Sequence, residues 1–561
     1  MSDAQTLMAR VSDTALQKVT RLFNASIDDI IAELLQNARR SGATEVAIDT
    51  IDDPDLGAAI QFRDNGPGLA DPQSLLTLGA SDWTHDMQAN EDPAGMGFFA
   101  LAGRHARVIA QKRGTQTAYV LDIAPTALSG DVPITCKEIA RDETGVTVIF
   151  AQLPSENVAA AARTAARYAL IPVLLDGHPV DREDYLDGAA HIEEWKGIRI
   201  GVYRDRDPKY HHHHSNANFH GVTLTVPLPH LSQVNHVSFH AVIDVQSCAA
   251  LQLVLPARKD VVRNAFLVDL QQEIMRIYFR MLKDQGQHSL RFEDHQKAKA
   301  LGIELLPAMA RLRQFSPAHA DPDSNIYTEL MPLSDDAMVF AGAEAAVDEQ
   351  NFARALAATG QGASVFDPQP AFVGYDWYDA LPVLEVTGYA LAIGETQTVY
   401  SVGGAPPIIE RPDRLLVTGK LQSGRDIAPW EAETDLILFA EADATLIDEA
   451  VLCLTPTSPA THNDLVTFFT NALFAPCYDA DAGSYDAQLQ WFTDEAEDEV
   501  IRYLSTLEEV HLHQVERVIR RELWWILKTT SDIAIRIKGS EVQIDGLETA
   551  FARSAGEPAT A

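Results

Sequence analysis

The stretch from residue 27 to residue 102 contains ELLQN at residues 33–37, DNGPG at residues 64–68 and GMGFFA at residues 95–100. The first run lies in a segment whose apolar residues recur at helical spacing, and the second ends an alternating run that is typical of a strand. The third leads into another apolar segment with helical spacing. The stretch therefore predicts an α/β arrangement in which a helix, a strand end and a glycine-rich loop follow one another.

Each run carries residue types that suit one part of a nucleotide site. Glu33 and Asn37 are four residues apart, so a helix presents both on one face, where a carboxylate and an amide oxygen suit a hard cation and a polarised water. Asp64 precedes two glycines that let the backbone turn sharply and approach a ligand. Gly95 and Gly97 before a helix expose backbone N–H groups that can seat a phosphate.

Each run alone also has an ordinary structural interpretation. A Glu-x-x-x-Asn pair usually marks a solvated helix face, and DNGPG has the composition of a turn. A lone Gly-x-Gly is weak evidence for a phosphate site. The order of the three runs and the helix–strand pattern between them favour the nucleotide interpretation.

The combination resembles the GHKL ATPases, which include gyrase, the ninety-kilodalton heat-shock chaperones, histidine kinases and mismatch-repair MutL. The run at residues 95–100 is most similar to that of the heat-shock chaperones. The resemblance implies a two-layer domain that binds ATP with Mg²⁺. It further implies a role for each matching residue: Glu33 orients the attacking water, Asn37 holds Mg²⁺, Asp64 takes the base amino group, Gly66 and Gly68 line the base pocket, and Gly95, Met96, Gly97 and Phe98 lie against the phosphates.

Two positions depart from the pattern of that family. Asp92 stands where the family usually has a further glycine, three residues before Gly95. Val146 stands where the family has a threonine after a glycine. Thr147, the next residue, carries a hydroxyl and remains a nucleotide-binding candidate, although alternation along a strand turns its side chain to the face opposite that of Val146.

A second cationic element follows a strand-like run at residues 251–255. Arg258 and Lys259 lie at the turn between that run and a long amphipathic helix, where a cation can reach a neighbouring phosphate. The pattern is similar to the middle domain of the heat-shock chaperones, and Asn264, six positions after Arg258, matches its spacing. MutL and gyrase use a lysine for this task, so Lys259 is the alternative. A basic pair facing water is the ordinary structural interpretation.

The length of 561 residues suggests roughly three or four domains. We expect 1–152 to be the ATP-binding domain, with strands near 45–51, 106–111, 116–123 and 144–150 and a lid at 70–93. A second α/β domain of transducer or middle type is expected at 153–315 and an acidic mixed α/β region at 316–490. A helical C-terminal segment that closes with a hairpin is expected at 491–561.

The composition is that of a soluble globular protein, with no apolar run of membrane-spanning length and no secretory signal pattern. Four widely spaced cysteines indicate reduced thiols and a cytoplasmic location. Residues 321–500 contain 32 acidic and 5 basic residues, a net charge of −27, out of −36 for the whole chain. Such a region repels a phosphate backbone, so DNA is disfavoured as its main partner but is not excluded.

These observations predict a cytoplasmic, Mg²⁺-dependent ATPase that hydrolyses ATP slowly and acts as a switch on a protein client. A homodimer stays open, because the segment before the ELLQN helix often crosses to a second subunit in the resembling families. Two other functions also stay open. One is a DNA-transacting clamp of the MutL or topoisomerase kind, and the other is a nucleotide-sensing scaffold that never hydrolyses ATP.

Overall fold

The computed structural model describes residues 26–77, 97–130, 132–141, 143–205, 215–254, 260–320, 329–404, 411–441, 446–477 and 483–504, and beyond these residues 512, 515–519, 522, 534–539 and 541–545. The chain divides into two compact units, Met1–Ala308 (unit 1) and Met309–Ala561 (unit 2). Both units mix helices and sheets, so the chain has the α/β fold class that its sequence predicts.

Unit 1 begins with an eight-stranded sheet in the order β5-β4-β3-β6-β2-β1-β7-β8. Its strands are β1 (Val46–Asp53), β2 (Gly57–Asp64), β3 (Ala106–Gln111), β4 (Thr117–Ile123), β5 (Thr135–Ala140), β6 (Val146–Ala151), β7 (Val173–Leu175) and β8 (His178–Pro179). The helices are α2 (Ile27–Ser41), α3 (Gln73–Leu76) and α5 (Val158–Ala166), and the 3-10 turns are η1 (Gly97–Leu101) and η2 (Ala127–Ser129).

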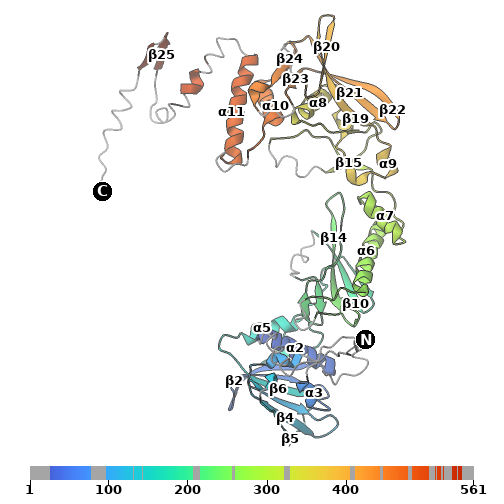
Figure 1. Cartoon of the computed structure of the whole chain (residues 1–561), viewed down its shortest axis with the longest axis vertical. Coiled ribbons are helices and arrows are strands. Elements are labelled where there is room, and N and C mark those ends of the chain that lie inside the picture. Colours follow the sequence, from blue (N-terminus) through green and yellow to red (C-terminus); the bar gives the residue numbers. More distant parts are fainter. Residues whose placement is uncertain are drawn as a thin grey trace, which may run out of the picture. The chain divides into compact units, whose positions relative to one another are not determined.

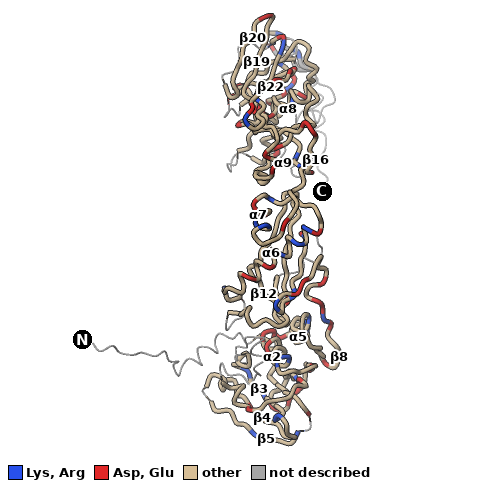
Figure 2. Tube along the Cα trace, turned by 90° about the vertical axis from the view of Figure 1, so that its right-hand side faces the viewer, with Lys and Arg blue, Asp and Glu red and all other residues tan. Residues whose placement is uncertain are grey.

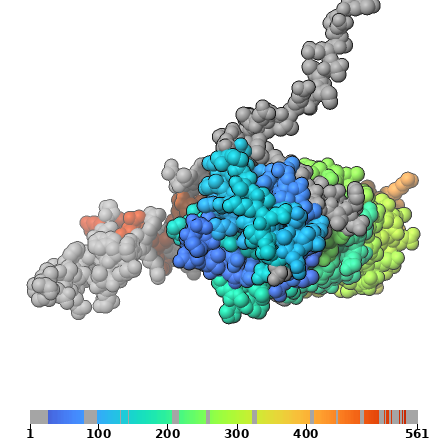
Figure 3. Space-filling view, turned by 90° about the horizontal axis from the view of Figure 1, so that it is seen from below, coloured from blue at the N-terminus to red at the C-terminus, as the bar shows by residue number. Residues whose placement is uncertain are grey.

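The core of this domain lies between one face of the sheet and the helices α2 and α5, which contact each other (Figure 1). Side chains along β2 alternate between the two faces of the sheet. Ile60 and Phe62 are therefore buried under the helices, whereas Arg63 is exposed on the other face. The early and late parts of the domain interleave, as the blue and cyan atoms of Figure 3 show. Helices on one face and a sheet on the other make the predicted two-layer arrangement.

The first domain extends beyond the boundary expected at residues 152 and 153. The helix α5 packs against α2, and β7 pairs in parallel with β1 through Val46 and Val173. The chain reaches β7 through the crossover helix α5, and strand pairing across more than 120 residues cannot be predicted from local spacing.

The second part of unit 1 is a sheet in the order β12-β11-β14-β10-β9, with β13 paired to β14. The long helix α6 buries its apolar face on this sheet through residues such as Leu270, Ile274 and Ile277. The elements are β9 (His191–Trp195), β10 (Ile198–Arg204), β11 (Ala217–Phe219), β12 (Val222–Leu224), β13 (His230–Ser232), β14 (Ser238–Val245), α6 (Ala265–Gln285) and α7 (Phe292–Ala300).

Unit 2 is built on a sheet in the order β18-β17-β19-β21-β22, with β20 paired to β19, and on the separate hairpins β15-β16, β23-β24 and β25-β26. Its strands are β15 (Arg311–Arg313), β16 (Leu330–Pro332), β17 (Met338–Phe340), β18 (Val365–Phe366), β19 (Val383–Ile393), β20 (Thr396–Ser401), β21 (Arg414–Ser423), β22 (Asp426–Thr434), β23 (Leu436–Phe439), β24 (Val451–Leu454), β25 (Ala534–Lys538) and β26 (Glu541–Asp545). Its helices are α8 (Ala346–Thr359), α9 (Asp376–Asp379), α10 (His462–Leu473) and α11 (Tyr485–Leu504), and its 3-10 turns are η5 (Gly362–Ser364), η6 (Pro370–Phe372) and η7 (Ile447–Glu449).

The helix α8 joins the two cores of unit 2, because Phe352 packs with the large sheet and Val347 packs with α10 and the β23-β24 hairpin. Ala496 and Val500 of α11 lie in the same core as α10. The boundary expected at residues 490 and 491 therefore falls inside a continuous helix that begins at Tyr485. Figure 2 shows the acidic residues of this unit, in red, spread over several elements.

Within the described parts of the chain, no helix combines the length and the apolar character needed to cross a bilayer.

Candidate functional site

The helix α2 is specified locally at both ends and along one side. Ser26 caps its N-terminus by accepting a hydrogen bond from the backbone N–H of Asp29 at 3.2 Å, and Gly42 ends it with φ at 88°. Its apolar residues are buried in the core, which leaves Glu33 and Asn37 partly buried on the remaining face. The helix therefore presents both predicted side chains together, as their spacing requires.

The first residue of η1 brings the glycine-rich run onto this face. A Cβ atom added to Gly97 would overlap Oε2 of Glu33 and would lie 3.5 Å from Nδ2 of Asn37. Any other residue at this position would displace the Glu33 carboxylate from its present place. The structure thus brings together Glu33, Asn37 and Gly97, residues up to 64 positions apart in the sequence.

The segment after Gly97 differs from the helix that the sequence predicts. It is a five-residue 3-10 turn, and the side chain of Phe98 is buried in the core. A long helix dipole is therefore absent from this described segment, and a phosphate would be held by the backbone N–H groups of the turn. Gly95 and Met96, together with residues 78–93 of the expected lid, lie outside the described residues.

Asp64 ends β2 with its carboxylate held in one orientation. Its Oδ1 atom accepts hydrogen bonds from the backbone N–H of Gly66 at 2.9 Å and of Val146 at 3.3 Å. In the described part of the chain, no donor reaches its Oδ2 atom. Burial raises the pKa of Asp64, and these two hydrogen bonds and the charge of Arg141 counteract that rise.

The two glycines after Asp64 fold the loop against neighbouring elements. A Cβ atom on Gly66 would lie 2.6 Å from Oγ of Ser41 on α2. Gly68 has φ at +73°, and a Cβ atom there would overlap the carbonyl oxygen of Gln111 at the end of β3. Gly68 therefore requires glycine for close approach and for its backbone conformation, whereas a side chain at Gly66 would have to displace the side chains of Ser41 and Asp64.

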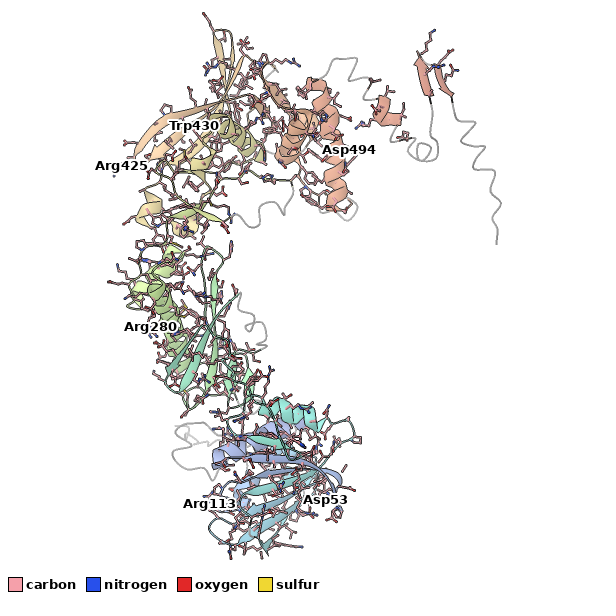
Figure 4. The ribbon with its side chains drawn as sticks, turned by 180° about the vertical axis from the view of Figure 1, so that it is seen from behind. Asp53, Arg113, Arg280, Arg425, Trp430 and Asp494 are labelled. Atoms are coloured by element: carbon pink, nitrogen blue, oxygen red, sulfur yellow. The ribbon has the colours of Figure 1, made fainter. Side chains whose placement is uncertain are left out.

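The site lies at the end of the sheet that Arg113 marks in Figure 4, opposite the β1–β2 turn at Asp53. Arg113 donates a hydrogen bond to the carbonyl oxygen of Gly68 at 3.3 Å. Gly97 contacts α2 at Glu33 and Asn37, and Gly66 contacts it at Ser41. These three positions recur every four residues, so they follow one helix face over about 12 Å.

Asn65, which the three sequence runs do not single out for a role, holds the loop after Asp64 in place. Its Oδ1 atom accepts hydrogen bonds from the backbone N–H of Thr44 at 2.8 Å and of Glu45 at 3.1 Å, and its Nδ2 atom donates to Oγ1 of Thr44 at 2.8 Å. The side chain ties the loop to the start of β1. Asparagine is frequent in turns for this kind of local bond, but its distant partner could not be read from spacing.

Thr147 lies on the wrong face for the role that its place in the sequence suggested. The register pairs it with Arg63, and opposed residues of an antiparallel pair point to one face, so Thr147 faces away from the Asp64 side. Its hydroxyl accepts a hydrogen bond from Arg141 at 3.0 Å. The contact with Asp64 comes instead from the backbone of Val146.

The cations expected from the second domain, Arg258 and Lys259, lie outside the described residues. Asn264 lies within the described residues, and its side chain bonds to backbone groups of the second domain. It caps α6 by accepting from the backbone N–H of Leu267 at 3.0 Å, and its Nδ2 atom donates to the carbonyl oxygen of Ala250 at 2.9 Å. Both ends of its amide are therefore used within the second domain.

The chemistry of the donor set fits a magnesium–nucleotide complex. No group of three or more metal-ligating side chains occurs among the described residues. Magnesium does not need one, because it is usually held by one or two protein oxygens together with substrate phosphates and water. The amide of Asn37, whose Nδ2 atom lies near the Gly97 backbone, could supply one such oxygen.

No family model matches the sequence, and no curated protein matches it. The chain is similar to the solved ATPase region of Saccharomyces cerevisiae topoisomerase II bound to ICRF-187 (dexrazoxane), with 10% identity, 49% of this chain and 98% of that chain covered, and a TM-score of 0.34. Another structure of that ATPase region has 10% identity, 35% and 71% coverage and a TM-score of 0.27. The N-terminal domain of a DNA repair protein has 15% identity, 34% and 72% coverage and a TM-score of 0.23. All three TM-scores are below 0.5, so the function of this chain is inferred below from its own residues.

Proposed function

We propose that unit 1 binds ATP with Mg²⁺ and hydrolyses it. The observation that carries this proposal is the single face of α2 along which Glu33, Asn37 and Ser41 meet two glycine backbones, one from η1 and one from the loop after Asp64. Near its start, that face presents the carboxylate of Glu33 and the amide of Asn37 beside the glycine turn at Gly97. Near its end, it lies beside the loop that follows the oriented carboxylate of Asp64. These ends suit the phosphates and the base of one nucleotide.

Each residue then has one task. The carboxylate of Asp64 accepts a hydrogen bond from the amino group of the base, and Gly66 and Gly68 let the backbone lie close to the ring. Glu33 accepts a hydrogen bond from the attacking water and orients it toward the terminal phosphate. Asn37 would hold Mg²⁺, which neutralises phosphate charge when it is bound.

Turnover is expected to be slow, because positioning and electrostatics do the work and a closing segment gates it. By resemblance, the expected lid and Arg258 or Lys259 complete the site. Arg258→Ala should slow turnover more than it weakens ATP binding. An unaffected rate would shift the assignment to Lys259 or to no contact from the second domain.

The experiment compares the wild type with Glu33→Ala by calorimetric ATP binding and by phosphate release. The variant should bind ATP within about threefold of the wild type and should lose turnover by about a hundredfold or more, because it lacks the water-orienting carboxylate. Glu45→Ala, which removes an exposed carboxylate after the same helix, serves as the control and should change neither quantity. Unchanged phosphate release in Glu33→Ala would refute the assignment, and ATP binding by a wild type that never releases phosphate would support the scaffold function.

The net charge of residues 321–500 indicates which class of macromolecular partner to expect. The excess of acidic residues at 321–500 favours a protein client over DNA for that region. The clamp alternative predicts that duplex DNA stimulates phosphate release and that added salt abolishes the stimulation. The client alternative predicts no response to DNA at any salt concentration.

A further inference from the structure

Residues 304–308, the last residues of unit 1 and here called the exit segment, are held to the rest of that unit by two histidine side chains. The Nε2 atom of His288 lies 2.7 Å from the carbonyl oxygen of Leu306, and the Nε2 atom of His295 lies 3.3 Å from that of Leu305. Within the described part of the chain, these are the hydrogen bonds that the exit segment makes. The segment forms neither helix nor strand, so the two imidazoles replace a regular backbone pattern.

His288 stands on a backbone that is fixed more firmly than the segment it holds. The adjacent residue, Ser289, accepts a hydrogen bond from the backbone N–H of Val234 at 2.8 Å and donates its own N–H to Oε1 of Gln233 at 2.9 Å. His288 is only 3% exposed, whereas Leu306 is 66% exposed. A change at the imidazole therefore acts first on the exit segment.

The hydrogen bonds of His288 determine its protonation state. A backbone N–H only donates, so the 3.2 Å bond from the N–H of Leu290 makes Nδ1 an acceptor. The ring hydrogen is then on Nε2, which donates to the carbonyl oxygen of Leu306. This is the neutral imidazole, and a second proton would have to enter at Nδ1, where it would meet the N–H of Leu290. Protonation thus removes a hydrogen bond and leaves a buried cation facing a donor.

The groups around His288 also disfavour its charged form. The ring centre of His295 on α7 lies 5.8 Å from that of His288. Burial lowers the pKa of His288, the hydrogen bond to Leu306 raises it in part, and the charge of His295 lowers it again. Among the described charged groups, no carboxylate offsets a proton at this position. Other titratable or charged side chains on the surrounding elements are solvent-exposed or, for Asp294, paired with Lys297: Lys283, Asp284, Arg291, Asp294, Glu304 and His236.

We propose that His288 is a proton-operated latch, which holds the exit segment on unit 1 while its imidazole is neutral and releases it when the imidazole is protonated. A charged imidazole is far more stable in water than at this buried position. When the ring turns outward, the carbonyl oxygen of Leu306 loses its donor, and the bond from His295 is left to hold the segment. Because the exit segment ends unit 1, its release lengthens the chain that joins this unit to unit 2. The latch does not depend on nucleotide binding.

Amide hydrogen exchange on the full chain, measured by mass spectrometry near pH 7.5 and near pH 5, tests the latch. Two amides report on it. The N–H of Leu290 bonds to the ring, and the N–H of Ile303 bonds to the carbonyl oxygen of Ala298 at 2.9 Å, just before the exit segment. Each rate is divided by that of an unstructured peptide of the same sequence, which removes the intrinsic effect of pH. The amides of β14 should stay protected at both pH values, which shows that the second part of unit 1 remains folded.

In the wild type, protection of both reporting amides should fall by about fivefold or more between pH 7.5 and pH 5, because the latched form binds the proton more weakly than the released form. His288→Gln keeps a donor for Leu306 but cannot take up a proton, so its protection should change by less than about twofold. His288→Asn keeps an acceptor near Leu290 but is too short to reach Leu306, so Ile303 should exchange about fivefold faster than in the wild type near pH 7.5. His178→Gln removes an exposed histidine elsewhere in unit 1 and, as the matched control, should behave as the wild type.

Wild-type protection that does not respond to pH would overturn the proposal. A wild-type response in His288→Gln would also overturn it, and loss of that response in His295→Gln would then assign it to the second ring. Thermal unfolding verifies that each variant is folded. If neither variant of His288 folds, exchange of its ring C2 hydrogen in the wild type measures its ionisation, and ionisation without loss of protection at Leu290 and Ile303 would refute the latch.

Discussion

Gly97 illustrates how one missing side chain can organise a site. Its backbone occupies the space beside Oε2 of Glu33, which any Cβ atom would overlap. The carboxylate of Glu33 can occupy its position because Gly97 has no side chain, and in the proposed function its orientation toward the attacking water would depend on that glycine.

Gly97→Ala should accordingly lower phosphate release by about a hundredfold, because the added methyl group displaces the carboxylate by an ångström or more. Since both changes act on one group, adding Gly97→Ala to Glu33→Ala should alter turnover by less than about threefold. Gly362→Ala, where an added Cβ atom meets nothing within 4 Å, is the matched control. A wild-type rate in Gly97→Ala would contradict the assignment.

Asp64→Asn tests the other end of the site. The amide can keep an oxygen toward the N–H groups of Gly66 and Val146, so the loop should stay folded. Its NH₂ group then replaces the Oδ2 acceptor and opposes the amino group of the base. Affinity for ATP should fall by about tenfold to a hundredfold with an unchanged unfolding temperature. Calorimetry that shows intact affinity would remove Asp64 from base recognition.

At the scale of elements, the loop after β2 acts as a unit that Asn65 holds to β1. The three hydrogen bonds from this side chain to Thr44 and Glu45 fix the loop near α2. The orientation of Asp64 and the close approach of Gly66 both depend on this anchorage. In the proposed function, base recognition therefore depends on the loop as well as on Asp64.

Asn65→Ala should weaken ATP binding by about tenfold, because the loop loses bonds that hold it in the binding geometry. Asn65→Asp keeps the two accepted bonds and should retain most of the affinity. Calorimetry on both variants, with circular dichroism to verify the fold, measures the effect. Equal affinities of the wild type and Asn65→Ala would show that the loop is held by its glycines alone.

At the scale of the whole molecule, the two units carry different chemistry. Unit 1 contains the candidate site, and most of the acidic excess lies in unit 2. Burial raises the pKa of Asp367 in unit 2 to about 6, and the nearby charge of Arg313 counteracts part of the rise. A raised carboxyl pKa means that the folded state binds the proton more tightly, so this contribution to stability is present below about pH 4 and is lost as the pH rises through 6.

Asp367→Asn removes this titration. Its unfolding temperature should match that of the wild type near pH 4 and should exceed it by about 2–4 °C at pH 7.5, as measured by scanning calorimetry. Asp376→Asn, at an exposed position of the same unit, should show no pH-dependent difference. A constant offset between Asp367→Asn and the wild type at both pH values would contradict the assigned titration.

The sequence alone determined the parts of this protein that depend on neighbours along the chain. The cap at Ser26, the apolar spacing and Gly42 specify α2, and the helical period places Glu33 and Asn37 on one face. The strand expected at residues 106–111 is confirmed as β3, and β1, β4 and β6 lie within two residues of their expected bounds. Alternation also predicts correctly that Thr147 turns away from the Asp64 face.

Only the tertiary structure decided which of these pieces meet. Gly97 lies against Glu33, Gly66 lies against Ser41, and Arg141 donates a hydrogen bond to Thr147 of β6. All three contacts follow from the sheet order and from packing between distant segments. The same holds for β7, whose pairing with β1 extends the first domain past its expected end. The spacing of residues along the chain predicts which face of a helix or strand a side chain occupies and where that element ends. Contacts between elements depend on strand register and close packing, which no local sequence pattern contains.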